Sequence, residues 1–453
     1  MTPQLRVIGG GLAGCEAAWQ AAAMGVHVAL YEMRPLVTTG AHKSGDLAEL
    51  VCSNSLRSAS IENAVGLLKE EMARLGSLIV AAARATAVPA GGALAVDREL
   101  FSAFILERIA ANPRIELRRE EVRELDDSTP VIVACGPLGS PALTEALARL
   151  CGSPHLHYYD AASPIVAADS IDRAHVFAAS RYGKGGDDYL NIALDRAQYL
   201  TLVDDLVNSP KAQPHGFEAD ATGGSVPYFE GCLPVEEMAR RGADTLRFGP
   251  LKPVGLGAST GTRPYAVVQL RRENAAGTAY NLVGFQTRLT WPAQRATLGK
   301  LPGLGNAEWI RLGVMHRNTF VDAPRVLAED LSLRRAPHIF LAGQVSGCEG
   351  YVEAAATGIV AAHNAVRRIR QEQVAFVPPA TTALGSLLAY LRDTTSADFQ
   401  PQNVSFAYMS PLDEPVRDKR RRRELLAQRA LATIDEIART LQAHEATHEI
   451  MPV

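Results

Sequence analysis

Two cysteines stand in sequence settings that favour thiol chemistry. Cys52 lies in a Ser- and Asn-rich loop ahead of a predicted helix, where backbone amide dipoles would favour the thiolate. Cys232 follows Phe-Glu-Gly and precedes Leu-Pro, which predicts a rigid turn. A thiolate can act as a nucleophile or accept a proton, so both residues are candidates for catalysis. The alternative stays open that both are small buried hydrophobic residues, as most cysteines are.

The cysteine pattern argues against other kinds of site. The six cysteines lie far apart, with no Cys-x-x-Cys pair and no zinc spacing, so we expect neither a disulfide framework nor a metal site. This usage fits a reducing cytoplasm. A predicted strand begins within a few residues of Met1, so no signal peptide is expected. The most apolar long run, 78–96, contains an Arg, a Pro and two Gly residues, so no membrane span is expected either.

A glycine-rich loop near the N-terminus predicts a dinucleotide site. A strand over 5–8 leads into a Gly-x-Gly-x-x-Gly sequence, a helix over 15–24 and a second strand over 26–31. In such a unit the pyrophosphate lies against the loop and the start of the helix. A carboxylate after the second strand can accept hydrogen bonds from both ribose hydroxyls, which favours FAD or NAD over NADP. The candidate cofactor residues are Gly9, Gly10, Gly11, Leu12, Ala13, Gly14, Glu32, Met33 and Arg34.

The chain returns to a similar pattern near its C-terminus. A strand over 339–342 ends at a glycine, and an Ala-rich helix follows over 354–370. A strand and a helix start in this position commonly close over a pyrophosphate and flavin. Glycine-rich turns at both chain ends favour FAD, the longer ligand. Further candidate cofactor residues are therefore Gly343, Gln344, Glu349, Gly350 and Tyr351.

Length and patterning predict an α/β protein with an insertion. A chain of 453 residues is too long for one ordinary core. Helical patterning predicts one helix over 61–83 and another over 98–111, which Asp97 caps. This patterning becomes sparse from about residue 158 and returns after 316. We therefore predict a discontinuous Rossmann-like FAD-binding domain over 1–157 and 317–453. An inserted α+β substrate domain occupies 158–316, and a last helix spans about 415–444.

Basic residues supply candidate contacts to a polyanion. The net charge of -3 gives no global attraction, so any nucleic-acid surface must be local. Lys419, Arg420 and Arg421 open the last helix, where positive charge opposes the helix dipole. Phosphate contact explains this run, and a solvated charge run is the open alternative. Arg181 and Lys184 add basic groups within the predicted insert.

One histidine is a further candidate ligand. His316 lies where the insert meets the FAD-binding domain, and clefts between domains commonly hold ligands. A structural role for this histidine is the alternative.

Several motifs resemble the bacterial folate- and flavin-dependent tRNA (uracil-5-)-methyltransferases. The most specific are Tyr31-Glu-Met-Arg-Pro35 and Ala48-Glu-Leu-Val-Cys-Ser-Asn-Ser-Leu-Arg57. The resemblance continues at 229–234, 313–320 and 342–351 and covers nearly the whole chain, although the last block is shared with the tRNA wobble-uridine flavoproteins. The chain departs at Tyr189-Leu-Asn-Ile-Ala, where Asn-Cys-Pro is expected, and at Gln402, where Met is expected.

This resemblance implies a reaction and its partners. Methylenetetrahydrofolate would supply one carbon to carbon 5 of the uridine at position 54 in the tRNA T loop, and FAD reduced by NADPH or NADH would carry and reduce that carbon. By family pattern Cys232 would add to carbon 6 of uracil and activate carbon 5, with Cys52 as acid/base or flavin-side partner. His316 could cover the pterin, and the basic residues could hold tRNA phosphates.

Two other functions stay open at this point. The first is a wobble-uridine-modifying flavoprotein, which the chain length and the Glu-Met-Arg-Pro motif disfavour. The second is a non-catalytic, FAD-stabilised tRNA-binding module. The sequence does not reveal the oligomeric state.

Overall fold

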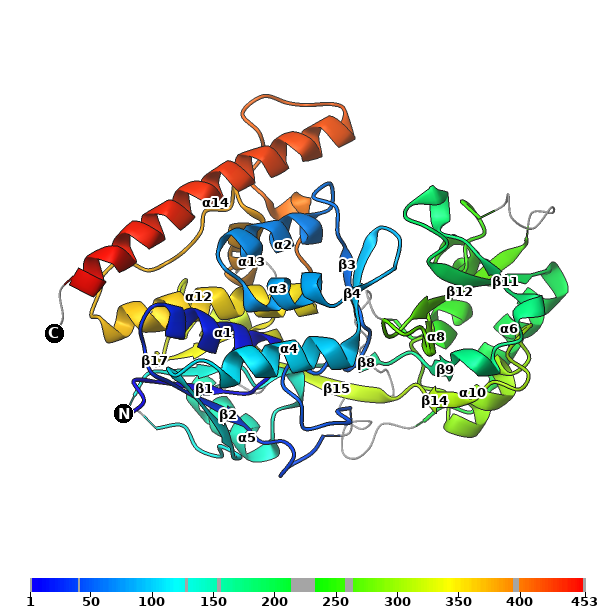
Figure 1. The fold of residues 1–453 in the computed structure, drawn as a ribbon, viewed down its shortest axis with the longest axis horizontal. Helices are drawn as coiled ribbons and strands as arrows, with labels where there is room; N and C mark the ends of the chain where they lie inside the picture. The colour runs from blue at the N-terminus through cyan, green and yellow to red at the C-terminus, as the bar shows by residue number, and fades with distance from the viewer. Residues whose placement is uncertain are drawn as a thin grey trace.

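The computed structural model describes residues 2–39, 41–126, 129–152, 156–212, 233–256, 264–393 and 399–450. Within these ranges it describes the side chains of all residues except 156–161, 315–317 and 447–450. Figure 1 shows two lobes, a larger one that holds both ends of the chain and a smaller one made from the middle of the chain.

The larger lobe is built around a six-stranded sheet in the order β16-β17-β7-β1-β2-β6. Neighbouring strands run parallel, except that the short β16 is antiparallel to β17. Both ends of the chain contribute strands to this sheet, which confirms the predicted discontinuous Rossmann-like fold. Its strands are β1 (Leu5–Ile8), β2 (Val28–Glu32), β6 (Ile115–Arg119), β7 (Val131–Val133), β16 (Ser332–Leu333) and β17 (Ala336–Leu341).

Two helices from opposite ends of the chain pack closely beside this sheet. α1 (Leu12–Ala23) and α12 (Tyr351–Ile369) lie side by side in Figure 1 and contact each other along their length. A Cβ atom on Gly358 would lie 2.4 Å from the carbonyl oxygen of Ala13, so only glycine permits this approach. α12 corresponds to the helix predicted over 354–370, but it begins three residues earlier, at Tyr351.

The single helix predicted over 61–83 is wrong. The structure has two helices, α2 (Ala64–Arg74) and α3 (Leu78–Ala85). Gly76 has a φ of +74°, which ends the first helix, and the Ser77 side chain accepts a hydrogen bond from Val80 N and starts the second. Apolar periodicity continues across the break, so the pattern did not reveal it.

The remaining helices of the larger lobe cover the sheet and its edges. Asp97 caps α4 as predicted, since its carboxylate accepts from the amides of Glu99 and Leu100, both at 3.1 Å. α14 lies across the top of the lobe in Figure 1. These helices are α4 (Arg98–Ala110), α5 (Pro141–Cys151), α11 (Ala323–Val326), α13 (Ala383–Leu391) and α14 (Lys419–Ile450).

The smaller lobe, called the insert below, has its own antiparallel sheet and core. The strand order is β10-β11-β12-β13-β9-β14. The strands are β9 (Ile165–Ala167), β10 (Phe177–Ala178), β11 (Tyr189–Leu194), β12 (Ala266–Arg272), β13 (Ala279–Leu282) and β14 (Trp309–Arg311). The helices are α6 (Arg196–Asn208), α8 (Val235–Arg240), α9 (Thr245–Phe248) and α10 (Trp291–Leu298). This is the predicted α+β insertion.

Two small sheets lie where the lobes meet. β8 (Leu156–Ala161) pairs antiparallel with β15 (Met315–Phe320) and carries the chain out of the larger lobe and back. β3 (Ser55–Ser58), β4 (Ala87–Val88) and β5 (Ala93–Val96) form the second sheet. The predicted boundaries at 157/158 and 316/317 fall within the β8–β15 pair, and the point of separation stays a prediction.

Candidate functional site

The glycine-rich loop is shaped by two close backbone approaches. Gly9 has a φ of +110°, and a Cβ there would lie 2.3 Å from the carbonyl oxygen of Ala134 on the neighbouring strand. A Cβ on Gly14 would lie 1.8 Å from the carbonyl oxygen of Gly9. A Cβ on Gly11, by contrast, would meet no atom within 4 Å. The first and third glycines thus allow packing, and the middle one leaves the backbone open to the cavity.

The start of α1 is suited to a phosphate group. No side chain caps this helix at Gly11, and no acidic residue lies in its first turn. The amides of the first turn have no partner within the helix, and the helix dipole favours an anion there. The loop therefore fits the pyrophosphate of a dinucleotide.

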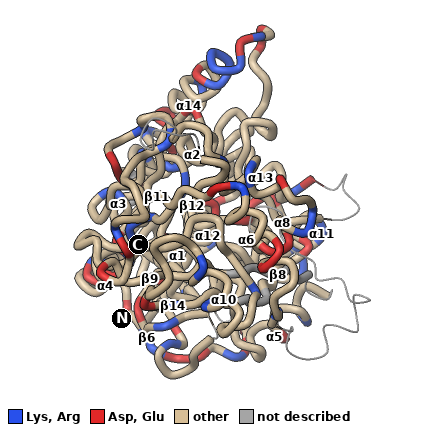
Figure 2. The backbone as a smooth tube through the Cα atoms, turned by 90° about the vertical axis from the view of Figure 1, so that its right-hand side faces the viewer, with Lys and Arg blue, Asp and Glu red and all other residues tan. Residues whose placement is uncertain are grey.

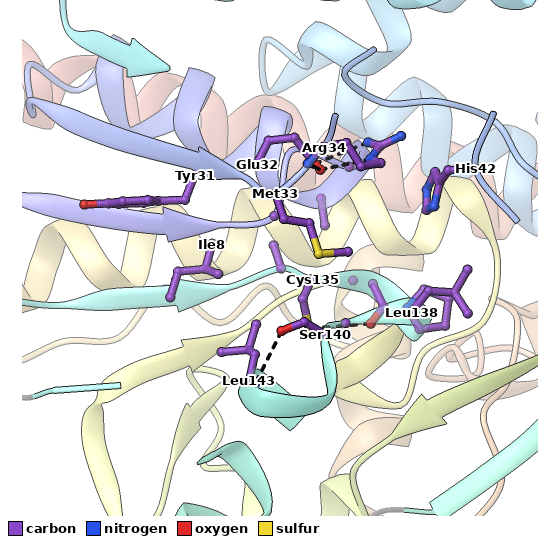
Figure 3. A pocket seen from close by; sticks show the side chains of 18 of the residues that line it. Ile8, Tyr31, Glu32, Met33, Arg34, His42, Cys135, Leu138, Ser140 and Leu143 are labelled. Atoms are coloured by element: carbon purple, nitrogen blue, oxygen red, sulfur yellow. Dashed lines mark hydrogen bonds and ion pairs between the residues drawn. The ribbon is translucent and has the colours of Figure 1, made fainter. Parts of the chain in front are cut away.

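A cavity with about 980 Å³ of open space, including its mouth, extends from this loop. Ten predicted cofactor residues line it, namely Gly9, Gly11, Leu12, Ala13, Glu32, Met33, Arg34, Gly343, Gln344 and Tyr351. Four predicted residues do not line the cavity but are close in sequence to residues that do, namely Gly10, Gly14, Glu349 and Gly350. In Figure 3 the Met33 side chain lies between the Glu32–Arg34 pair and the turn that holds Cys135 and Ser140.

The sequence reasoning missed part of the cavity wall. His42, Glu121 and the turn from Cys135 to Ser140 also line the cavity. Burial, followed by the positive charge of Arg34, lowers the pKa of His42 to about 4, so this wall carries a neutral imidazole at neutral pH. The signal in the sequence is the apolar strand over 130–136, which ends in a glycine turn, but this pattern is equally typical of a buried central strand.

Glu32 connects the second strand to the glycine-rich loop. Its carboxylate accepts hydrogen bonds from the Gly10 amide and the Arg34 amide, both at 2.9 Å, and from Arg34 Nε at 2.9 Å. Burial would raise the pKa of this carboxyl, but the hydrogen bonds and charge of Arg34 outweigh it and lower the pKa. Glu32 is therefore ionised and held rigidly at the cavity wall. Its contact with a ribose stays a prediction.

Cys52 lies next to this cavity, at the edge of the insert. Its amide donates to the hydroxyl of Tyr351 at 2.7 Å, and the Ser53 amide donates to the same oxygen at 3.3 Å. Because Tyr351 also lines the cavity, one side chain contacts both the loop that carries the thiol and the space for the cofactor.

Three arginines lie near the Cys52 loop. Arg98 of α4 donates to the carbonyl oxygen of Leu50, and Arg271 of β12 donates to Ser53 Oγ. A negative charge on Cys52 would favour the charged forms of both and of Arg311 of β14. Burial lowers the pKa of Arg271 and of Arg311, and negative charges nearby, including that of Cys52, oppose this effect. Such a group of cations favours the thiolate form of a cysteine. Neither Arg271 nor Arg311 was among the residues predicted from the sequence, since each comes from a strand of the insert.

Arg311 differs from the other two arginines in its contacts. Its Nε atom is buried and has no hydrogen-bond partner among the residues that the structure describes. Arg98, in contrast, donates to Glu273 at 2.5 Å, and Arg271 donates to Ser53 Oγ at 2.7 Å. Among these three arginines, Arg311 is therefore the one with a buried unpaired Nε donor.

The Cys-Ser-Asn sequence docks the thiol loop onto the insert. Asn54 is fully buried, and its amide nitrogen donates to the carbonyl oxygens of Val96 and Arg272, both at 2.9 Å. Its oxygen accepts from Arg271 Nε at 3.0 Å and from Asn281 at 3.3 Å. The site is thus assembled from both lobes, and Cys52 lies at their junction.

The other predicted catalytic and folate-contacting residues are less fully placed. Cys232 lies outside the described residues. His316 is in β15, opposite Asp160 of β8, and its side chain is not described. Their roles stay predictions.

Two predicted basic residues of the insert behave differently from each other. The Arg181 guanidinium points inward, since Nε donates to Gln269 at 2.7 Å and Nη1 donates to the carbonyl oxygen of Lys252. These contacts hold the loop after α9. Lys184 is exposed at the edge of the insert. Whether either contacts tRNA stays a prediction.

The basic run at the start of α14 is exposed and partly ion-paired. Arg420 contacts Glu62 and Glu424, both at 3.2 Å, and Arg421 contacts Glu424 at 3.3 Å. Lys419 lines a separate groove below the helix. Figure 2 shows the Lys and Arg residues near this end of α14, which projects from the rest of the molecule.

The structure was also compared with the requirements of a metal site and of a membrane span. Among the described residues there is no group of three or more His, Cys, Asp or Glu side chains that could hold a metal ion. In the same part of the chain, no helix is both long and apolar enough to cross a membrane.

Comparison with known proteins identifies the family. The family model described as Glucose inhibited division protein A matches residues 4–373. The protein named "Methylenetetrahydrofolate--tRNA-(uracil-5-)-methyltransferase TrmFO" from Geobacter sulfurreducens is 56% identical over 437 residues, which cover 96% of this chain and 99% of that protein. A protein of the same name from Heliobacterium modesticaldum is 54% identical and covers 95% of this chain and 96% of its own length.

A solved structure agrees with the fold. Aquifex aeolicus GidA superimposes with a TM-score of 0.70 at 16% identity, and the match covers 97% of this chain and 76% of that one. This likeness shows the fold alone, whereas the sequence identities above show the family. The chain therefore belongs to the family of folate-dependent tRNA (uracil-5-)-methyltransferases, as its motifs predicted.

Proposed function

We propose that this protein methylates carbon 5 of the T-loop uridine in tRNA, with methylenetetrahydrofolate as the one-carbon donor and FAD as cofactor. The observation that carries the proposal is the double role of Tyr351. It lines the dinucleotide cavity and also accepts hydrogen bonds from the amides of Cys52 and Ser53. A redox cofactor in this cavity and the Cys52 thiol would therefore meet at one side chain, which supports a reductive methylation of uracil.

The cofactor site is formed by the chain's two ends. The glycine-rich loop and the start of α1 would hold the pyrophosphate, Glu32 would face the ribose, and Gly343 to Tyr351 would close the other side. When bound and reduced by NADPH or NADH, FAD supplies the electrons that turn the transferred carbon into a methyl group. The surrounding residues keep this chemistry in a largely apolar cavity.

The thiols would supply the remaining chemistry. Carbon 5 of uracil is a poor nucleophile until a thiolate adds to carbon 6 and generates an enolate. We assign this addition to Cys232, and we assign removal of the carbon-5 proton to Cys52. The arginines near the Cys52 loop support this assignment, because nearby positive charge favours the anionic form of a thiol that accepts the proton.

The substrates would approach from the insert side. The target base must leave the loop stack to reach the thiols, as with other enzymes that act on a base. His316 would cover the pterin, and Lys184 and Lys419 would contact phosphates. The proposed compartment is the cytoplasm. The wobble-uridine alternative is not favoured, because the relatives at 54–56% identity carry the uracil-5 name.

The test uses purified holoenzyme, unmodified tRNA transcript, NADPH and methylenetetrahydrofolate labelled at the transferred carbon. Label is expected in 5-methyluridine. Label that enters only from S-adenosylmethionine would contradict the folate reaction.

Two single variants then separate catalysis from binding. Cys52→Ala and Cys232→Ala are each expected to lose methylation by at least about 100-fold while they keep FAD and tRNA binding. If both variants still methylate at the wild-type rate, the thiol mechanism is wrong. A non-catalytic binding module would show no methylation in the wild type either.

A further inference from the structure

A second large groove lies beneath the first turns of α14. It has about 1590 Å³ of open space, including its mouth, and is separate from the dinucleotide cavity. One wall comes from the start of α2 and from Arg57, and the other comes from residues 404–416 and the first two turns of α14. We call it the α14 groove.

The α14 groove is rich in positive charge. Arg57, Lys419, Arg422 and Arg423 all line it, against one acidic residue, Glu414. Lys419, Arg422 and Arg423 make no ion pair with any residue that the structure describes. Their neighbours Arg420 and Arg421 lie outside the groove lining and are paired with Glu62 and Glu424. The run is thus divided into paired cations outside the groove and unpaired cations within it.

This arrangement costs helix stability. The start of a helix carries partial positive charge, so three cations within the first turns of α14 are placed unfavourably. An anion in the groove would compensate both for the helix dipole and for the mutual repulsion of the cations. Asp418 supplies one negative charge here, because its carboxylate accepts from the Arg421 amide at 2.6 Å, and a bound anion would add to this compensation.

The inner end of the groove points toward the thiol site. Arg57 ion-pairs through Nη2 with Glu353, in the first turn of α12. The same Nη2 atom lies 3.1 Å from where a Cβ on Gly350 would be, and Gly350 directly precedes Tyr351. Arg57, which lines the groove, therefore lies beside the segment that carries Tyr351.

An aromatic side chain completes the lining. The guanidinium carbon of Arg423 lies 5.6 Å from the centre of the Phe406 ring, and both residues line the groove. Cations beside an aromatic ring are the combination by which proteins hold unpaired nucleic-acid strands, since phosphates meet the cations and bases stack on the ring.

We propose that the α14 groove binds the sugar–phosphate backbone of the tRNA strand that flanks the target uridine, through Arg57, Lys419, Arg422 and Arg423. This inference rests on the proposed function, because it takes tRNA as the substrate. Of the three residues predicted from the sequence, Lys419 is kept, whereas Arg420 and Arg421 give way to Arg422 and Arg423, which line the groove.

The test compares two double variants of the full-length holoenzyme with equal loss of charge on the same helix. Arg422→Gln/Arg423→Gln removes two cations of the groove, and Arg420→Gln/Arg421→Gln removes the two paired cations beside it. Affinity for a fluorescent, unmodified tRNA transcript is measured between about 50 and 200 mM salt. Absorbance of bound FAD and the melting temperature verify that each variant is folded.

The groove variant is expected to raise Kd for tRNA by about tenfold at 100 mM salt and to lower the slope of log affinity against log salt by about 1.5, as for two lost phosphate contacts. KM for tRNA should rise similarly, with kcat within about twofold of wild type. The paired variant should change Kd by less than about twofold.

Equal effects of the two variants, or a larger effect of the paired variant, would overturn the assignment to the groove. So would failure of the wild type to bind the transcript. If the wild type binds tRNA but transfers no labelled carbon, the proposed function fails while the comparison of the two variants still decides the groove.

Discussion

At the scale of single residues, the site depends on cations that come from different elements. Arg98, Arg271 and Arg311 approach Cys52 from α4, β12 and β14. The motif around Cys52 indicated a reactive thiol, but the sequence contained no local signal for its neighbours in space. Arg271 and Arg311 lie more than 200 residues away in the chain, so only the fold brings them to the thiol.

The substitution Arg311→Gln tests the effect of these cations. Removing one positive charge disfavours the thiolate, so the rise of the methylation rate with pH should move to higher pH by about one unit. At pH 7 the rate should fall by up to about tenfold. The measurement is the single-turnover methylation rate from pH 6 to 9.

Arg325→Gln is the control, because Arg325 is exposed and pairs with Asp322 on the surface of α11. A pH profile of Arg311→Gln that coincides with that of the control would show that Arg311 does not influence the catalytic thiol.

At the scale of elements, periodicity and caps predicted most helices, and tertiary contacts decided their ends. Asp97 marked the start of α4 correctly, because its side chain binds the first-turn amides. The sequence pattern did not predict the break between α2 and α3. Ser77 caps the second helix, and its Oγ also donates to Glu16 of α1 at 2.6 Å, which fixes the position of this cap. That contact joins residues 61 positions apart, which no local pattern reveals.

α12 contains a titratable group that makes the larger lobe sensitive to acid. The His363 ring is buried and lies 4.5 Å from the Phe376 ring. Burial, followed by the charge of Arg367, lowers the pKa of His363 from 6.5 to about 3. Between these pH values the unfolded chain binds a proton that the folded chain does not, so stability is complete above pH 6.5 and decreases as the pH falls.

The substitution His363→Phe should therefore flatten the acid side of the stability curve. The wild type is expected to lose about 1 kcal/mol more than this variant for each pH unit between 6 and 4. Urea unfolding at several pH values measures the difference. His338→Phe, at a half-exposed position on β17, is the control. Parallel pH curves for wild type and His363→Phe would exclude this histidine as the source.

At the scale of the whole molecule, the active site exists only while the two lobes stay docked. The sequence predicted the insert and the return of the chain to the first sheet, since composition changes near 158 and the strand-then-glycine pattern recurs at 339–343. It did not predict how the lobes meet. The contact is made by Asn54, Asp97 and Arg98 of the larger lobe with residues 271–281 of the insert.

Asn54 is the central residue of this contact, so its replacement should loosen the docking while each lobe keeps its own core. Leucine has the same number of side-chain heavy atoms and the same branching, but it cannot pair with the carbonyl oxygens of Val96 and Arg272 or with Arg271 Nε. We expect Asn54→Leu to reduce the free energy of unfolding by about 2–4 kcal/mol, because buried polar partners lose their hydrogen bonds. Methylation should fall further than FAD content, because FAD binds to the larger lobe and Arg271 and Arg311 come from the insert.

Urea unfolding, FAD absorbance and the methylation rate are measured on one preparation. Asn274→Leu, in the exposed turn between β12 and β13, is the control. Equal losses of FAD and methylation would mean that Asn54 supports the cofactor lobe rather than the junction, and the account of a site assembled by docking would then be wrong.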